Sequence, residues 1–330
     1  MSGIPFSVAL LIALALVFDF LNGFRDSASI VATMIASRAL SGRQILVITA
    51  LAEFAGPFIF GVTVATTLGS ELLNSSTLQL SIILAALIAA IVWNVITWWL
   101  GIPSSSSHAL VGGLIGAAML GNGWNAIKLT GLGKILLALA ISPPVGLIAG
   151  YLVMKLVLFL ARGATPRINQ FFKRSQILTA LTLAFSYGAN DGQKTMGVVT
   201  LGLVTARVLP VFHVPSWVIV MQASAIALGT ITGSWRIIRT LGGRFYKVRP
   251  VHGFSTQIAS AGVILGAAIL GGPVSTTQVI SSALIGVGSA ERMSKVRWEV
   301  AEHIVLAWLA TMPVTALLAA GLAVILRRWL

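Results

Sequence analysis

The feature that most constrains this chain is a series of long apolar runs, several of which reach the roughly 20 residues that an α-helix needs to cross a bilayer. Hydrophobic residues make up 57% of the 330 residues and charged residues only 9%, too few to cover a soluble domain. The runs lack the period-two alternation of a membrane β-barrel. We therefore expect an all-α polytopic membrane protein.

The first apolar run and the cysteine content indicate how the chain is processed and where it resides. The first run, IPFSVALLIALALVFDF, has neither a basic start nor a small-residue cleavage site, so we expect a membrane helix rather than a signal peptide. The chain has no cysteine, which excludes disulfides and thiolate metal sites. The expected location is a cell membrane, crossed several times, with a prokaryotic inner membrane favoured.

The net charge of +14 is carried mostly between the apolar runs, which is typical of cytoplasmic loops and argues against nucleic acid as a partner. The densest groups are expected in two cytoplasmic loops, and anionic lipid headgroups are their expected neighbours. These groups are Arg162, Arg167, Lys173 and Arg174, and then Arg236, Arg239, Arg244, Lys247 and Arg249.

The two halves of the chain repeat one another. Phe20, Gly23 and Asp26 recur as Phe185, Gly188 and Asp191 at an offset of 165 residues. PSSSSHALVGGLIG, from Pro103, recurs as PVSTTQVISSALIG, from Pro273, at an offset of 170. Two polar motifs in the same order indicate a duplication, with one membrane repeat over 1–165 and a second over 166–330. Such repeats point to a transporter with a central binding site.

If both basic loops are cytoplasmic, the chain crosses the membrane an even number of times between Arg174 and Arg236. Residues 216–235 account for one crossing, which leaves an odd number for residues 176–209. We therefore expect the two repeats to have inverted topology. One helix broken at GAND satisfies that number, and we expect NGFRD to break its helix likewise. The runs that begin at Pro103 and Pro273 are also expected to be re-entrant or broken helices. Membranes tolerate such backbone only where it faces protein or a wet cavity.

Each hydroxyl motif combines a proline, hydroxyl residues and an apolar helix-forming run, which is the pattern of a helix start. The first N–H groups of a helix and its dipole attract anions, so both motifs are candidate oxyanion sites. The alternative is simple capping, which requires only one hydroxyl per helix. The candidate ligands are Ser104, Ser105, Ser106 and Ser107, and then Ser275, Thr276 and Thr277.

The carboxylates Asp26 and Asp191 would repel an oxyanion unless positive charge lies between them, so they suggest a cation site. The cation is a proton, or a metal ion held by Asp26 and Asp191 with carbonyl and hydroxyl oxygens. A structural ion pair with Arg25 or Lys194 is the alternative. Glu53, in the middle of an apolar run, is a candidate proton relay or an interhelical hydrogen-bond partner.

Together these residues resemble the inorganic phosphate transporters of the Pit type. NGFRDSASIVAT is similar to the first signature of that family, GANDGQKTMG to the second, and ERMSKVRWEVAEHIVLAWLATMPVTALLA to its C-terminal region. The resemblance implies a secondary active symporter that imports phosphate with cations, is built from inverted repeats and is often a homodimer. The resemblance also implies that Asn190, Gln193, Lys194 and Arg25 are candidate phosphate ligands. It implies that Asn22 and Ser29 are candidate cation-coupling residues.

The chain departs from the family pattern at several positions. Arg25 and Ser29 stand where the first signature commonly has His and Asn, and Gln278 stands where His is common. Lys194 occupies a position at which sodium-coupled relatives tend to offer an amide oxygen. An ammonium group cannot ligate sodium. Our hypothesis is therefore that Lys194 and Arg25 supply fixed positive charge, and that the remaining charge of phosphate is balanced by protons or by transport as a neutral metal–phosphate complex. Sodium at Asp26 stays open.

Two other functions share part of this pattern. A transporter of sulfate or another oxyanion fits every physical argument above, and only the resemblance favours phosphate. A membrane phosphatase acting on lipid pyrophosphates could use SSSSH as nucleophile and base. That enzyme needs an acidic cluster nearby, whereas Glu71 is the nearest upstream carboxylate and the second copy has no His. We therefore expect a non-enzyme with no cofactor, whose coupling ion is a proton or sodium.

Overall fold

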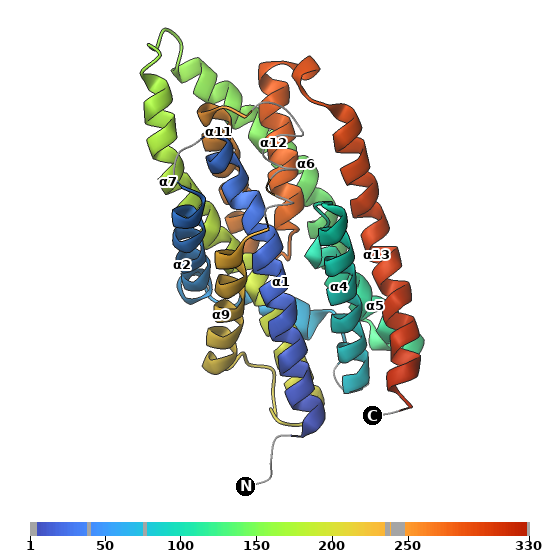
Figure 1. Cartoon of the computed structure of the whole chain (residues 1–330). Coiled ribbons are helices and arrows are strands. Elements are labelled where there is room, and N and C mark those ends of the chain that lie inside the picture. The colour runs from blue at the N-terminus through green and yellow to red at the C-terminus, as the bar shows by residue number, and fades with distance from the viewer. Residues whose placement is uncertain (1–4, 38–40, 75–77, 235–237, 239–247, 329–330) are drawn as a thin grey trace.

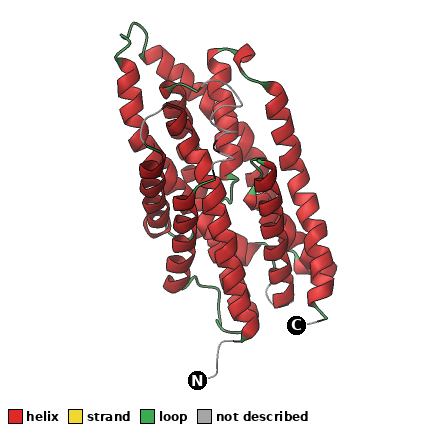
Figure 2. Ribbon diagram, viewed as in Figure 1, coloured by secondary structure: helices red, strands yellow, loops and turns green. Residues whose placement is uncertain are grey.

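The computed structural model describes residues 5–37, 41–74, 78–234, 238 and 248–328, and all its elements are helical (Figures 1 and 2). Among these residues a single β-bridge, Leu73 to Ile127, is the one strand-like pairing. The expected all-α fold is confirmed. In chain order the elements are α1 (Phe6–Ser37), α2 (Gly42–Phe60), α3 (Thr63–Thr66), η1 (Thr67–Glu71), α4 (Leu80–Leu100), α5 (Ser106–Asn122), η2 (Trp124–Ala126), α6 (Leu129–Leu160), α7 (Ile168–Tyr187), η3 (Gly188–Gly192), α8 (Gln193–Thr205), α9 (Ser216–Thr232), α11 (Pro250–Ile269), α12 (Thr276–Glu291), η4 (Met293–Lys295) and α13 (Trp298–Leu326).

Within the described residues, five helices are long and apolar enough to cross a bilayer, namely α1, α2, α4, α6 and α13. Only 22% of the apolar window of α13 and 28% of that of α6 are buried inside the chain, so most of both helices faces outward, as lipid-exposed helices do. Elements α7, η3 and α8 follow one another from Ile168 to Thr205 and form a further long helical path that carries the polar GAND segment. The expected multi-pass membrane architecture is confirmed.

The expected break at NGFRD is wrong, because α1 runs without interruption from Phe6 to Ser37. Its polar side chains find partners on other helices: Asn22 and Arg25 both bind Asn94 of α4. These partners satisfy polar side chains that would be costly inside a membrane helix, so α1 can stay continuous. At GAND, by contrast, the helix widens into the π-helical turn η3, a distortion that is frequent at functional sites.

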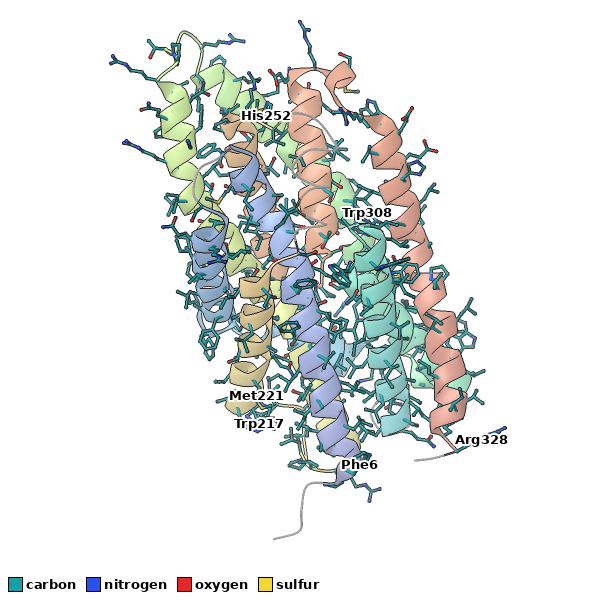
Figure 3. All side chains as sticks on the ribbon, viewed as in Figure 1. Phe6, Trp217, Met221, His252, Trp308 and Arg328 are labelled. Carbon is teal, nitrogen blue, oxygen red and sulfur yellow. The ribbon has the colours of Figure 1, made fainter. Side chains whose placement is uncertain are left out.

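The helices that begin at the two hydroxyl motifs run in opposite directions from the middle of the molecule. α5 ends at the lower end of Figure 1, where Asn122 accepts a hydrogen bond from Arg327 at 3.0 Å. α12 ends at the upper end, where Glu291 lies 2.9 Å from the Nε2 atom of His252. Figure 3 labels His252 and Arg328 near these opposite ends. Both helices start beside the centre of the bundle, as expected for Pro103 and Pro273.

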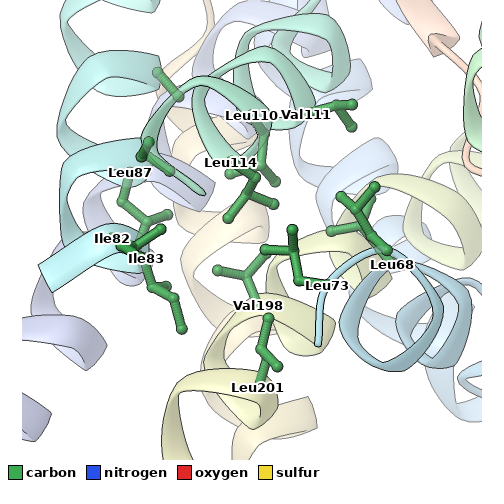
Figure 4. Packing of buried hydrophobic residues seen from close by; sticks show 14 of the residues in the cluster. Leu68, Leu73, Ile82, Ile83, Leu87, Leu110, Val111, Leu114, Val198 and Leu201 are labelled. Atoms are coloured by element: carbon green, nitrogen blue, oxygen red, sulfur yellow. The ribbon is translucent and has the colours of Figure 1, made fainter. Parts of the chain in front are cut away.

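A large apolar cluster holds the lower half together (Figure 4). Leu87 of α4, Leu114 of α5 and Val198 of α8 are each fully buried in it. Because lipid tails are as apolar as these side chains, the cluster holds the helices together by close van der Waals packing. The cluster fixes α4, α5 and α8 against one another, and so fixes the position of the N-terminal end of α5.

Helices α1 and α9 cross in close backbone contact through two glycines. A Cβ atom on Gly23 would lie 2.0 Å from the carbonyl oxygen of Ile226, and one on Gly229 would lie 2.0 Å from that of Phe20. A matching contact joins η3 to α2, where a Cβ on Gly188 would lie 2.0 Å from the carbonyl oxygen of Glu53. Small residues at such crossings let membrane helices approach closely.

Substitution of Gly23 by Ala is expected to destabilise the protein, because the new methyl group meets backbone that cannot move aside. Overpacking of this kind costs about 1–3 kcal/mol. Gly321→Ala in α13 is the matched control, since nothing lies within 4 Å of its Cβ position. The melting temperature in detergent reports the difference. Equal melting temperatures for the two variants would contradict the close crossing.

Candidate functional site

One hydroxyl in each motif caps its helix. Ser105 Oγ accepts the backbone N–H of His108 at 3.1 Å, and Ser275 Oγ accepts that of Gln278 at 3.4 Å. Both residues are N-caps, with extended backbone, of α5 and α12. Capping therefore accounts for Ser105 and Ser275, and leaves the next two hydroxyls of each motif free for other partners.

Those next hydroxyls contact the two signature aspartates. Asp26 of α1 accepts hydrogen bonds from both motifs, at 2.9 Å from Thr277 and 3.4 Å from Ser106. Asp191 of η3 accepts one from Thr276 at 2.5 Å. Both carboxylates are about 4% exposed. Residues far apart in the sequence are thus brought to one buried site by the starts of α5 and α12.

Lys194 joins the second aspartate to the first hydroxyl motif. Its ammonium group forms a buried ion pair with Asp191, three residues earlier, and donates to Ser107 Oγ at 2.6 Å. It also donates to the carbonyl oxygen of Val274 at 2.6 Å, in the loop before α12. One fixed positive charge therefore links η3, α5 and the approach to α12.

Arg25 supplies a second buried positive charge, but not to Asp26. Its guanidinium donates to Asn94 Oδ1, to Ser104 Oγ at 2.8 Å and to the Ser104 carbonyl at 3.2 Å. Asp26 itself has no Lys or Arg within salt-bridge distance in the described part of the chain. Adjacent residues on a helix point about 100° apart, so Arg25 turns away from Asp26 to α4 and the loop before α5.

A small cavity of about 10 Å³, room for about one water molecule or ion, lies between the carboxylates. Its lining comes from α1, α2, α7, η3 and α9, and consists of Asn22, Gly23, Asp26, Glu53, Tyr187, Asp191 and Ile226. Glu53 is 2% exposed and accepts a hydrogen bond from Thr230 of α9. Among the described residues no group of three or more His, Asp or Glu has the arrangement of a metal cluster. Carboxylate, amide and hydroxyl oxygens around one space suit a proton or a hard cation.

Acidic oxygens thus lie beside the N-terminal ends of two helices. A family model described as "Phosphate transporter family" matches residues 22–319. The chain belongs to this family.

Relatives support the same assignment. A "probable low-affinity inorganic phosphate transporter" of Bacillus subtilis is 40% identical over 315 residues, which cover 94% of each chain. One of Rhizobium meliloti is 42% identical over 312 residues, covering 94% of this chain and 93% of the relative. Because these relatives are named as transporters, the expectation of a transporter rather than a phosphatase is confirmed.

A solved structure shows the same fold. "The sodium-dependent phosphate transporter" superposes with a TM-score of 0.88 over 98% of this chain and 100% of that chain, at 24% identity.

Two residues expected to bind phosphate in this phosphate transporter family member are engaged elsewhere. Gln193 accepts the backbone N–H of Val64 at 2.8 Å and donates to the carbonyls of Gly61 and Ala189 at 2.5 and 2.6 Å. Asn190 donates to the carbonyl of Gly272 at 3.1 Å. Both side chains hold backbone segments beside the site. Ser29 lies buried one turn after Asp26.

Residues that the motifs did not indicate also contribute to the site. Asn94 receives Arg25 and donates to Asn22 at 3.3 Å, and Tyr187 lines the cavity. Thr230 holds Glu53. Asn94 could have been found from the sequence, because it is a polar residue within the apolar run of α4. Such a residue is costly in a membrane unless it has a polar partner on another helix.

The basic loops are described only in part. Arg162 follows α6, and Arg167, Lys173 and Arg174 lie before and within the first turns of α7, at the upper end of Figure 1. Arg249 precedes α11 and pairs with Glu291. Arg236, Arg239, Arg244 and Lys247 lie outside the described residues.

Proposed function

We propose that this protein is a secondary active symporter that imports inorganic phosphate across a cell membrane together with a coupling cation. The observation that carries the proposal is the hydrogen bonding of Asp26 and Asp191 to hydroxyls at the starts of α5 and α12. Anion-binding helix ends and cation-binding carboxylates are thus in direct contact. A site of this kind favours an anion and a cation that move together.

Phosphate binds, in this proposal, between the first turns of α5 and α12. The donors are the unpaired N–H groups of both helices and the four hydroxyls Ser106, Ser107, Thr276 and Thr277, with the Lys194 ammonium as a fixed charge. Lys194 already contacts Ser107 and the loop before α12, so it needs little rearrangement to reach a bound oxyanion. Arg25 does not contact phosphate in this proposal; it donates to Ser104 and so holds the start of the first hydroxyl motif in place.

The coupling cation binds at Asp26 and the adjoining cavity. Asp26 is a buried carboxylate without an ammonium or guanidinium partner among the described residues, and such a group favours a cation or a proton. Asn22, Glu53 and Asp191 face the same cavity. A proton and sodium are the two candidates, and the structural neighbour is named as sodium-dependent. A third candidate is a divalent metal ion that is carried as a complex with phosphate and neutralises its charge.

The shared hydroxyls suggest how the two fluxes are coupled. Thr276, Thr277 and Ser106 donate to carboxylates in this structure, and each hydroxyl has one hydrogen to donate. When a cation or proton neutralises the carboxylates, their hold on these donors weakens, and the hydroxyls can turn to phosphate oxygens. Cation binding therefore favours phosphate binding, and by linkage phosphate favours the cation equally.

Two inverted repeats, 1–165 and 166–330, are supported by the opposite directions of α5 and α12 and by the matching Gly23 and Gly188 contacts. The upper end is proposed as cytoplasmic, because Arg162, Arg167 and Arg174 gather there, and anionic lipids are the proposed neighbours. A homodimer is the proposed assembly.

Uptake of labelled phosphate into proteoliposomes tests this function. An imposed tenfold gradient of the coupling cation is expected to raise accumulation up to about tenfold for one-to-one coupling, since each tenfold ratio is worth about 1.4 kcal/mol. Proton and sodium gradients are imposed separately, and arsenate and sulfate compete in parallel. Arsenate is expected to inhibit and sulfate not. Equal inhibition by both would favour a general oxyanion transporter, and accumulation indifferent to either gradient would contradict symport.

A further inference from the structure

A further buried acid, Asp19, lies on α1 outside the site described above. It is seven residues before Asp26, so the two share a helix face about 10 Å apart along the axis. Asp19 is 0% exposed and follows the apolar stripe of Leu11 and Ala15, both also 0% exposed. It is therefore a carboxyl group at the boundary between the polar centre of the protein and its apolar lower half.

The hydrogen bonding of Asp19 is incomplete. Its Oδ1 atom accepts from Thr195 Oγ1 of α8 at 2.5 Å, and its buried Oδ2 atom has no hydrogen-bond partner. A carboxylate oxygen with no donor is costly in an apolar interior, whereas a carboxylic acid is much less so. The surroundings therefore suit the protonated form.

No charged group on a neighbouring helix pairs with Asp19 in the described part of the chain. Helices α4 and α9, which pack on α1, carry no charged residue. The buried cations of α8 and α1 are engaged elsewhere, Lys194 with Asp191 and Arg25 with Asn94 and Ser104. The other charged groups of packed elements are Glu53 of α2, Asp191 of η3, Arg43 of α2, Lys173 and Arg174 of α7, His252 of α11 and Glu291 of α12. None of them is within salt-bridge distance of Asp19 in the described part of the chain.

The duplication does not require Asp19. At the offset of 165 that relates Asp26 to Asp191, Asp19 corresponds to Ala184 and Thr195 corresponds to Ile30. Both counterparts are apolar and buried. The pair of Asp19 and Thr195, which joins one residue from each half of the chain, therefore has no counterpart under the duplication.

We propose that Asp19 is a proton-binding site that ties phosphate transport to the proton gradient. The inference rests on the proposed phosphate symport. The carboxylate takes a proton from hydronium, leaving water, and returns it to water later in the cycle. Asp19 and the preceding Leu11 and Ala15 on α1 are fully buried in this structure, so exchange with water occurs in a state in which α1 and α8 have separated there. Sodium suits this position poorly, because it requires several oxygen ligands and Asp19 has one hydroxyl, that of Thr195, as its hydrogen-bond partner in the described part of the chain.

The Asp19→Asn variant tests the inference, since Asn keeps an oxygen for Thr195 but cannot take up a proton. Proteoliposomes that contain a pH-sensitive dye are loaded with unlabelled phosphate, and three quantities are compared with the original protein. Exchange of internal for external labelled phosphate, which needs no net proton movement, is expected to stay within about twofold. Accumulation driven by a proton gradient is expected to fall at least tenfold, and phosphate-dependent internal acidification is expected to be lost.

The matched control is Thr195→Val, which removes the hydrogen bond and keeps the carboxyl group. This variant is expected to retain proton-driven accumulation, with a shifted pH profile. Normal accumulation and acidification by Asp19→Asn would overturn the inference and leave Asp19 a structural partner of Thr195. If Asp19→Asn also loses exchange, Asp19→Glu decides: restored proton-driven uptake supports the inference, and failure to restore it overturns it.

The original protein separates this inference from the proposed function. Accumulation driven by sodium alone, with no response to a proton gradient, would overturn the role of Asp19 and leave phosphate symport intact. The absence of accumulation with any gradient would contradict symport itself.

Discussion

Phosphate uptake by an Asp26→Asn variant is expected to fall to the level of protein-free liposomes under every imposed gradient. Asn preserves the shape of the side chain and can still accept the hydrogen bond of Thr277. It has no charge to bind a cation and no carboxylate to protonate. Insertion and melting temperature are therefore expected to change little, while coupled transport is lost.

The control for this variant is Glu302→Gln, which removes one carboxylate from an exposed position on α13. Its uptake is expected to match the original protein, because surface charges in α13 do not touch the central site. Normal uptake by Asp26→Asn would remove Asp26 from the coupling mechanism. Equal loss in both variants would show that the effect reports general charge rather than the site.

Removal of Lys194 is expected to have the largest effect on stability. In Lys194→Met the Asp191 carboxylate stays buried, with its ammonium partner gone, and broken buried pairs of this kind cost about 3–5 kcal/mol. The double variant Asp191→Asn, Lys194→Met leaves no unpaired charge at this position. We therefore expect the double variant to melt at a higher temperature than Lys194→Met alone.

Thermal melting of both variants in one detergent measures this coupling directly, and Asp191→Asn alone completes the cycle. Full recovery is not expected, because Lys194 also donates to Ser107 and to the carbonyl of Val274. A double variant less stable than Lys194→Met would contradict the ion pair as the main role of Lys194 in the fold. Phosphate uptake by the double variant is expected to be lost in any case.

Much of this fold could be predicted from local sequence. Long apolar runs predict membrane helices because the bilayer offers the backbone no hydrogen-bond partner, and a proline followed by hydroxyls predicts a helix start by known capping chemistry. The starts of α5 and α12, with Ser105 and Ser275 as caps, follow these rules. Such signals depend on neighbours within one turn.

What could not be predicted depends on contacts between distant helices. NGFRD is expected from the sequence to break its helix as GAND does, but its Gly23 lets α9 approach closely and α1 stays continuous. The family resemblance makes Gln193 a candidate ligand, but it does not show that the amide bonds to the backbone at Val64 and Gly61. Arg25 turns to Asn94, which no motif contained. Each outcome was decided by tertiary neighbours.

Direct phosphate binding is the measurement that tests the shared site most closely. The dissociation constant for phosphate is measured in detergent over a series of proton and sodium concentrations, for the original protein and for Asp26→Asn. We predict that phosphate binds more tightly to the original protein as the coupling cation increases, and that Asp26→Asn loses this dependence, since the two ligands are linked through one set of hydroxyls. A dissociation constant in the original protein that is indifferent to both cations would contradict a common site for phosphate and its cation.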